Sequence, residues 1–274
     1  MTTATLGGLI KDYRIKKRLS QLEISLHIGW QDTSRLSKIE QGRVGKPIRG
    51  TIEKIIKALE LNAQEKGDFL FAGGYLPTDL EIKQAIAEIA DKIDNWSYPA
   101  YLMDFSFRWL YTNLYTLETA GYPPKFKKVV IKSRPNFLEF PFLPKEQFNI
   151  EILKGEDKDS LKPFQIAQIA AFKTENLHYQ NESWYKSLIK SLMKYQDFRK
   201  LWPKISLKDY HKKLFDYEYK RMIGNYNGKR RSLEFHIQTA KLITDPRFQI
   251  VLYYPANRKT EEFFKQENRQ KAMI

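Results

Sequence analysis

Hydrogen-bonding side chains gather in one short segment near the start of this 274-residue sequence. Between Asp32 and Gly42, the apolar residues Leu36 and Ile39 stand three positions apart, which places them on one face of a helix. The opposite surface then carries polar residues: Thr33, Ser34, Arg35, Ser37 and Lys38. Hydroxyl, guanidinium and ammonium groups on an exposed helix hydrogen-bond to the base edges and phosphates of duplex DNA. The segment therefore predicts polar recognition of a nucleic acid.

A helix is narrow enough to enter the major groove, where its first outward-facing residues reach base edges. On this geometry we expect Thr33, Ser34 and Lys38 to read bases, with Ser37 on the same surface. Arg35 has two interpretations, contact with guanine or contact with the DNA backbone. Phosphate contacts are expected from Gln21, Arg43 and Lys46. The alternative is a basic helical bundle that binds protein or is only solvated.

Short helices must position this segment. Ser20 and Glu23 match the S/T-x-x-E pattern of a capping box, so a helix is predicted to start there and to end at Gly29. Asp32 can cap the next helix, and Gly42 closes it. Further helices are predicted around residues 9–19, 51–60 and 62–73.

These residues resemble the lambda-repressor-like, XRE-type helix-turn-helix family. The matching features are the opening Leu19-Ser20-Gln21, the turn residue Gly29 and the run Ser34-Arg35-Leu36-Ser37-Lys38-Ile39-Glu40-Gln41-Gly42. One residue more than in the usual pattern stands between Gly29 and Ser34. The resemblance implies an all-α DNA-binding domain, expected over residues 1–76. A homodimer is also expected, because one recognition helix makes few base contacts and paired half-sites are read by two-fold proteins.

Net charge supports an anionic partner but does not choose one. The chain has 47 Lys and Arg against 32 Asp and Glu, a net charge of +15. Ten basic and four acidic residues lie between Leu9 and Gly50, so basic charge is present where DNA contact is predicted. There is no cysteine, which excludes disulfides and thiolate metal sites. With no signal peptide and no long apolar run recognisable, we expect a cytoplasmic protein without membrane insertion.

The pattern changes after the first 76 residues. A connector helix is predicted over residues 77–97, with Thr78 as its cap, and a second domain over 98–265. Strands are expected at 100–103 and 108–112, and a three-strand meander at 214–222, 233–243 and 248–254. Turns of that meander are placed at Gly224-Asn225 and Asn227-Gly228-Lys229. Five prolines within 123–158 predict loop with helical turns, and helices are expected near 164–172 and 188–203.

The second domain resembles the MmyB-like ligand-binding domain. The matching runs are Tyr98-Pro99-Ala100-Tyr101-Leu102-Met103-Asp104, Trp109-Leu110-Tyr111-Thr112-Asn113 and Phe198-Arg199-Lys200-Leu201-Trp202. The resemblance implies an α+β, PAS-like fold with a five-stranded antiparallel sheet and a pocket for a fatty-acid-like amphiphile. The candidate pocket residues are Tyr101, Trp109, Tyr111, Asn113, Arg199 and Trp202. The alternative for the aromatic residues is ordinary core packing, and for Arg199 a helix cap or a surface ion pair.

Signals of catalysis are scarce. The four histidines show no metal-binding spacing, and no Walker, G-x-G-x-x-G or G-x-S-x-G motif occurs. We therefore expect a regulator that is not an enzyme, requires no metal or cofactor, and responds to a bound amphiphile. Two alternatives are a DNA-binding protein whose second domain serves only dimerisation or protein interaction, and an enzyme acting on nucleic acid or lipid, which the missing motifs disfavour.

Overall fold

The chain forms two compact units, and the first of them is assembled from two separate stretches. Its structure is a computed structural model that describes residues 5–120, 122–139, 142, 158–206, 219–226 and 229–271. The first unit comprises Met1–Pro77 and Lys241–Arg247, and the second comprises Thr78–Ala240 and Phe248–Ile274. The boundary at Pro77 lies one residue beyond the predicted end of the first domain. The return of residues 241–247 to the first unit was not predicted.

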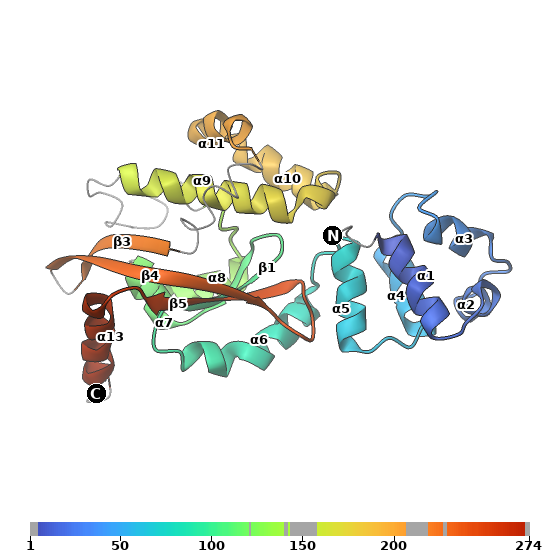
Figure 1. Ribbon diagram of the computed structural model, residues 1–274, viewed down its shortest axis with the longest axis horizontal. Helices are drawn as coiled ribbons and strands as arrows, with labels where there is room; N and C mark the ends of the chain where they lie inside the picture. The colour runs from blue at the N-terminus through green and yellow to red at the C-terminus, as the bar shows by residue number, and fades with distance from the viewer. Residues whose placement is uncertain are drawn as a thin grey trace. The chain divides into compact units, whose positions relative to one another are not determined.

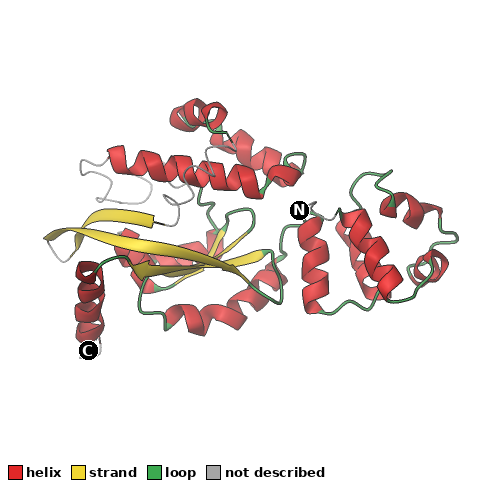
Figure 2. Cartoon of the chain, in the orientation of Figure 1, coloured by secondary structure: helices red, strands yellow, loops and turns green. Residues whose placement is uncertain are grey.

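Five helices make up the N-terminal stretch of the first unit (Figures 1 and 2). They are α1 (Leu6–Lys16), α2 (Gln21–His27), α3 (Ser34–Glu40), α4 (Arg49–Ala58) and α5 (Ala63–Ala72). The predicted capping box at the start of α2 is confirmed, because Ser20 accepts from the backbone N–H of Glu23 and the Glu23 carboxylate accepts from that of Ser20. Gly29 and Gly42 follow α2 and α3 with φ of +85° and +66°, conformations that favour glycine.

The core of the first unit is aliphatic, with one phenylalanine from α5 at its centre. Its fully buried members include Ile10, Ile24, Leu36, Ile52, Ile55 and Phe69. Burial of each such side chain contributes roughly 1.5–3 kcal/mol. Helix α1 also approaches the end of α3 very closely, because a Cβ on Gly7 would lie 2.4 Å from the carbonyl oxygen of Ile39. Glycine at this position lets α1 support α3.

The second unit combines helices with one sheet. Its helices are α6 (Asp79–Asp94), α7 (Leu114–Ala120), α8 (Phe126–Ser133), α9 (Lys158–Glu175), α10 (Ser183–Leu192), α11 (Gln196–Leu201) and α13 (Arg258–Lys271), with 3-10 turns η4 (Leu177–Tyr179) and η5 (Trp202–Lys204). Its strands are β1 (Ala100–Asp104), β2 (Trp109–Thr112), β3 (Tyr219–Tyr226), β4 (Lys229–Lys241) and β5 (Phe248–Pro255), in the order β2-β1-β5-β4-β3. Within the unit, α6 follows one side of the sheet and α9–α11 lie on the other (Figure 1). The predicted mixture of helices with an antiparallel sheet is confirmed.

Strand register decides which side chains share a face. Strand β1 pairs antiparallel with both β2 and β5, so that Tyr101 lies opposite Val251. The β1–β2 pairing shifts between Leu102 and Met103, and Leu102 lies opposite Tyr111 while Met103 lies opposite Trp109. Because successive residues of a strand point to opposite faces, this shift sends Trp109 and Tyr111 to different faces of the sheet.

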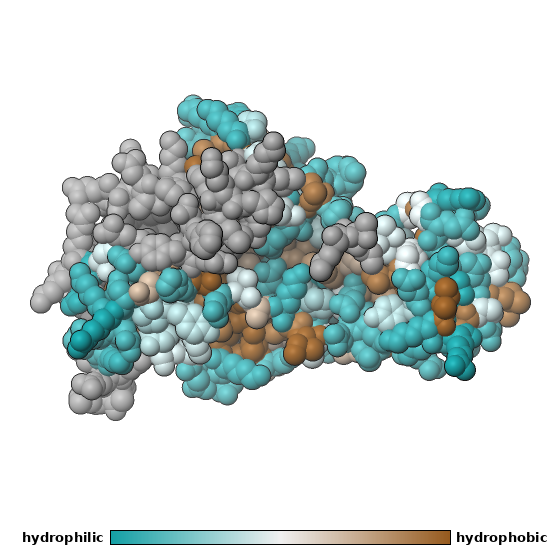
Figure 3. All heavy atoms as spheres, viewed as in Figure 1, coloured by the Kyte–Doolittle hydropathy of each residue, from teal (hydrophilic) through white to brown (hydrophobic). Residues whose placement is uncertain are grey.

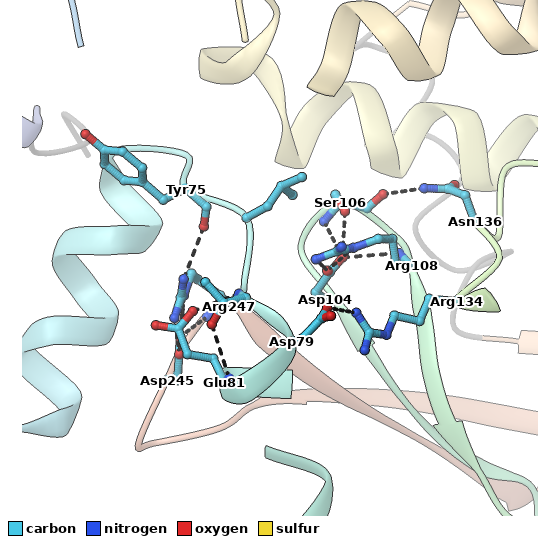
Figure 4. A network of polar contacts seen from close by, with 12 residues as sticks. Tyr75, Asp79, Glu81, Asp104, Ser106, Arg108, Arg134, Asn136, Asp245 and Arg247 are labelled. Carbon is cyan, nitrogen blue, oxygen red and sulfur yellow. Dashed lines mark hydrogen bonds and ion pairs between the residues drawn. The ribbon is translucent and has the colours of Figure 1, made fainter. Parts of the chain in front are cut away.

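A buried carboxylate closes the turn between β1 and β2. Asp104, fully buried at the end of β1, accepts from the Ser106 backbone N–H at 3.0 Å and from its hydroxyl at 2.7 Å. Arg108 supplies the opposite charge, with Nε 2.6 Å from Asp104 Oδ2, and Asn136 Nδ2 donates to the Ser106 carbonyl (Figure 4). These hydrogen bonds explain the turn that connects the two strands predicted at 100–103 and 108–112.

Several sequence predictions for the second unit were wrong. Gly224-Asn225 does not form a turn but continues β3, pairing with Arg231 and Arg230 of β4. Cross-strand pairing overrides the local turn preference there. Asn227 and Gly228 of the other predicted turn lie outside the described residues. By contrast, the two-turn helix α8, just after Pro123 and Pro124, agrees with the helical turns predicted for the proline-rich region. Helices α7 and α13 were not predicted. Residues 143–157 and 207–218, which contain the rest of the proline-rich region and the predicted start of β3, lie outside the described residues.

Candidate functional site

The outer surface of α3 is polar and basic, as its sequence predicts. Ser34, Arg35 and Lys38 are exposed, while Thr33 and Ser37 are half-buried. Leu36 and Ile39 point the other way into the core of the first unit, where they are at most 6% exposed. On the face seen in Figure 3, the first unit is mostly hydrophilic with small hydrophobic patches. The two predicted faces of this helix are confirmed, and the DNA contacts remain predictions.

An exposed carboxylate fixes the start of α3. Oδ1 of Asp32 accepts from the backbone N–H of Ser34 at 2.7 Å, so Asp32 does cap a backbone group at the helix start, but the N-cap position itself is Thr33, one residue later than predicted. This backbone hydrogen bond lowers the pKa of Asp32, with a smaller contribution from the charge of Lys38. The exposed face of α3 thus has one carboxylate, that of Asp32, beside the basic side chains of Arg35 and Lys38.

Two side chains of the predicted reading surface have partners within the first unit. The guanidinium of Arg35 lies 4.7 Å from the centre of the Trp30 ring, in a cation–π contact. A guanidinium stacked on a ring still directs its N–H groups outward from its edge. The Ser37 hydroxyl accepts from Gln41 Nε2 at 2.8 Å, which leaves its own proton for donation.

A nearly buried ion pair holds α1, α2 and α3 together. The Glu40 carboxylate accepts from Arg14 Nε at 2.7 Å and from Arg14 Nη2 at 2.9 Å. Gln21 Nε2 donates to the same carboxylate at 2.8 Å. The side chains of Arg14 and Glu40 are 12% and 2% exposed, and the hydrogen bond to Glu40 raises the pKa of Arg14. This arrangement links the first helix of the unit to the two that follow.

The three predicted phosphate contacts differ in their surroundings. Arg43 has an exposed side chain directly after α3, and its backbone N–H donates to the Lys38 carbonyl. Gln21 uses one amide N–H on Glu40 and retains a second. Lys46 also has partners within the protein, because its ammonium donates to the Gly74 carbonyl at 3.2 Å and lies 4.1 Å above the Tyr75 ring, and its phosphate contact stays a prediction. Its charge is therefore held by the protein in this structure.

Glu40 and Trp30 were not foreseen as residues that position α3. For Glu40 a signal was present, since it stands four residues after Leu36 and so falls on the apolar face of the helix. A carboxylate on that face needs a buried partner, which Arg14 provides. For Trp30, nothing in the spacing of the sequence identified Arg35 as its contact.

The six predicted pocket residues do not meet at one place. Tyr101 and Trp109 share the main aromatic cluster of the sheet, with ring centroids 6.1 Å apart and Phe137 stacked on Trp109. Tyr111 points to the other face, where its hydroxyl donates to Asp94 of α6 at 2.7 Å. The register shift in β2 separates residues that simple alternation would have kept together.

Asn113 is a capping residue rather than an open polar group. It is 1% exposed, and its Nδ2 atom donates to the carbonyls of Ile93, Trp96 and Tyr98. Its Oδ1 atom accepts from the backbone N–H groups of Ala100 and Thr116. The amide therefore ties the end of α6 to the starts of β1 and α7, and the protein itself satisfies the side chain.

Trp202 packs against a second hydrophobic cluster, formed mainly by α9, α10 and α11, and Arg199 lies outside this cluster. Trp202 stacks on Phe198 at 5.1 Å, and the Lys173 ammonium lies 4.3 Å from its ring centre. The Arg199 side chain is exposed in the last turn of α11. Neither residue shares a cluster with Tyr101 and Trp109, so the structure does not gather the predicted pocket residues into one hydrophobic cluster, and ligand binding by them stays a prediction.

The described residues offer neither a bilayer-spanning helix nor a metal cluster. Each helix of this part of the chain is too short or too polar to cross a membrane. In the same residues, no three metal-ligating side chains stand close enough to hold an ion. No protein-family model and no curated protein matches the chain.

Proposed function

We propose that this protein is a sequence-specific DNA-binding regulator that reads duplex DNA with α3. The observation that carries the proposal is the two-sided character of this helix. Leu36 and Ile39 fix one side in the core, and exposed Ser34, Arg35 and Lys38 occupy the other. Such a helix supplies hydrogen-bond donors to a groove while its own unit supports it.

Charge and local support agree with this proposal. Arg43 extends the basic surface just beyond α3, where a phosphate of the same duplex is expected. The Arg14–Glu40 pair and the Asp32 cap hold the helix at both ends. A homodimer, with one α3 in each of two half-sites, is part of the proposal and follows from the small number of base contacts that one short helix provides.

Two substitutions separate base reading from phosphate contact. Lys38→Ala should weaken binding to the preferred duplex by about 1–3 kcal/mol and affect other sequences much less. Arg43→Ala should weaken all sequences alike and reduce the salt dependence of binding by about one counterion. Binding is measured by fluorescence anisotropy at several salt concentrations, on a duplex selected from random sequence. Lys54→Ala, an exposed change on α4, is the matched control.

Two results would overturn this assignment. Identical effects of Lys38→Ala and Arg43→Ala on every duplex would show that α3 does not read bases. Absence of association with any duplex at low ionic strength would exclude DNA binding itself.

For the second unit, the aromatic packing favours dimerisation or protein interaction over a sensor. Tyr101, Trp109 and Phe137 fill space against one another in the sheet cluster, whereas a PAS-like sensor for an amphiphile needs a cavity there. Native mass spectrometry of protein purified from cells, compared with its denatured mass, distinguishes the two. A lipid-sized adduct on the native protein supports the sensor, and an unliganded dimer supports the alternative.

A further inference from the structure

The second stretch of the first unit is packed tightly onto α5. A Cβ on Gly67 would lie 2.8 Å from Cδ of Pro246 and 2.9 Å from Cα of Asp245, so only glycine admits this backbone. The Lys241 ammonium lies 4.2 Å from the centre of the Phe71 ring. Residues 241–247 are therefore an integral part of the unit that carries α3.

Arg247 joins this stretch to the end of the helical part. Its side chain is 1% exposed and pairs with Asp245, with Nη2 2.6 Å from Oδ2 and Nε 3.0 Å from Oδ1. Nη1 donates to the backbone carbonyl of Tyr75 at 3.3 Å (Figure 4). A buried guanidinium requires such partners, so this contact fixes the backbone of Tyr75.

The side chain of Tyr75 in turn holds the loop that follows α3. Its hydroxyl donates to the Pro47 carbonyl at 2.5 Å, and its ring lies under the Lys46 ammonium. Lys46 also donates to the carbonyl of Gly74. Residues 46 and 47 are thus bound to residues 74 and 75 by two hydrogen bonds and a cation–π contact. They follow the proposed phosphate contact Arg43 by only a few positions.

We propose that Tyr75 and Arg247 are positioning residues for the loop Arg43–Pro47. Tyr75 holds the loop directly, and Arg247 holds Tyr75 from the 241–247 stretch. The inference rests on the proposed DNA binding and extends it, because it makes the phosphate-contacting loop dependent on a segment far away in the sequence. Lys241 ends β4 and Phe248 starts β5, so both ends of that segment continue directly into strands.

The test uses the full chain with Tyr75→Phe, which removes one hydroxyl and keeps the ring. Hydrogen exchange of the amides at the two ends of the loop, Arg43 and Thr51, which donate to the carbonyls of Lys38 and Ile48, should become about two- to tenfold faster, the effect of losing one net hydrogen bond. Affinity for a selected duplex and for a random duplex should fall by the same factor. Exchange of the core amides of α3 should not change. Tyr13→Phe removes a hydroxyl elsewhere in the unit and is the matched control.

Arg247→Lys is the second variant, since it keeps the charge beside Asp245 but not the planar fork that also reaches Tyr75. It should accelerate exchange of the same loop amides. Unchanged loop exchange in both variants would overturn the inference, whether or not the protein binds DNA. Faster exchange with unaltered DNA affinity would overturn the positioning role. If the parent protein binds no duplex, the proposed DNA binding fails, and loop exchange still decides whether Tyr75 and Arg247 hold the loop.

Discussion

Glu40 shows how one buried charge supports the proposed reading helix. Its carboxylate receives three hydrogen bonds, two from Arg14 and one from Gln21, so residues of α1, α2 and α3 meet at one group. Removing one member of a buried ion pair leaves the other charge without a partner in a low-dielectric environment, and this lowers the free energy of unfolding. The loss is large even where the intact pair adds little net stability. The pair therefore specifies how the three helices fit together.

Replacing Glu40 should be far more damaging than replacing an exposed acidic residue. Glu40→Ala leaves the guanidinium of Arg14 without its counter-charge and should lower the free energy of unfolding by about 3–5 kcal/mol. Glu53→Ala removes an i,i+4 pair with Arg49 from a side chain that is 49% exposed, and should cost under about 0.5 kcal/mol. Urea unfolding of the two variants provides the comparison, and equal losses would contradict the role given to Glu40.

At the scale of elements, carboxylates placed at helix starts define where α2, α3 and α5 begin. Glu23 accepts from the Ser20 backbone N–H at 2.6 Å, and Glu65 accepts from that of Asn62 at 3.0 Å. The Asp32 carboxylate accepts from the backbone N–H of Ser34, two residues later in the chain. In each case the backbone hydrogen bond is the main cause that lowers the pKa of the carboxyl. The ionised form is favoured by folding.

These caps predict a loss of stability in acid. Because each folded pKa lies below its ordinary value, the stabilisation is fully present above about pH 4.5 and disappears as the pH falls through the folded pKa values. Urea midpoints should therefore decline from pH 5 to pH 3. The double variant Glu23→Gln/Glu65→Gln keeps amide acceptors that do not titrate, so its decline should be shallower. Parallel declines of parent and variant would contradict this explanation.

The elements also show where sequence reasoning succeeds. The starts of α2 and α3 were predictable because Ser20, Glu23 and Asp32 act on backbone groups two or three residues away. The faces of α3 were predictable because Leu36 and Ile39 follow helical spacing. The turn expected at Gly224-Asn225 was wrong because pairing with β4, the next strand of the chain, overrides the preference of these two residues for a turn. Tyr111 was misplaced for the same reason, since the register shift depends on β1.

At the scale of the whole molecule, the first unit is not one continuous segment of the chain. Its N-terminal stretch ends at Pro77, and Lys241–Arg247 completes it. No local sequence pattern predicts that residues 241–247 join the first unit. A glycine is needed at position 67 because Asp245 and Pro246, far away in the sequence, approach it closely. Hydrophobic periodicity and capping patterns are local, so they do not predict contacts between residues that lie far apart in the sequence.

The same substitution should have opposite effects in two contexts. In the full chain, Gly67→Ala forces its Cβ against the backbone of Asp245 and should destabilise the first unit by about 1–3 kcal/mol. In a fragment of residues 1–77 the obstacle is absent, and alanine should raise stability by up to about 1 kcal/mol through helix propensity. Gly50→Ala, whose Cβ would meet nothing within 4 Å, should be neutral or stabilising in both.

Thermal and urea unfolding would measure the effect of Gly67→Ala in the fragment and in the full chain. Hydrogen exchange of the α5 amides would show whether the effect is local to that helix. Equal effects in fragment and full chain would show that residues 241–247 are dispensable for the first unit.

The divided first unit has a consequence for biosynthesis. A ribosome makes Lys241 more than 160 residues after Pro77, so the five N-terminal helices emerge long before the segment that packs on Gly67. Until then Phe71 and the carbonyl of Tyr75 lack Lys241 and Arg247 as partners. Domains that emerge first generally fold first, but contacts this distant in sequence form late. The nascent chain should therefore complete the first unit only after β4 has been translated, which would delay the proposed DNA binding until most of the second unit has been made.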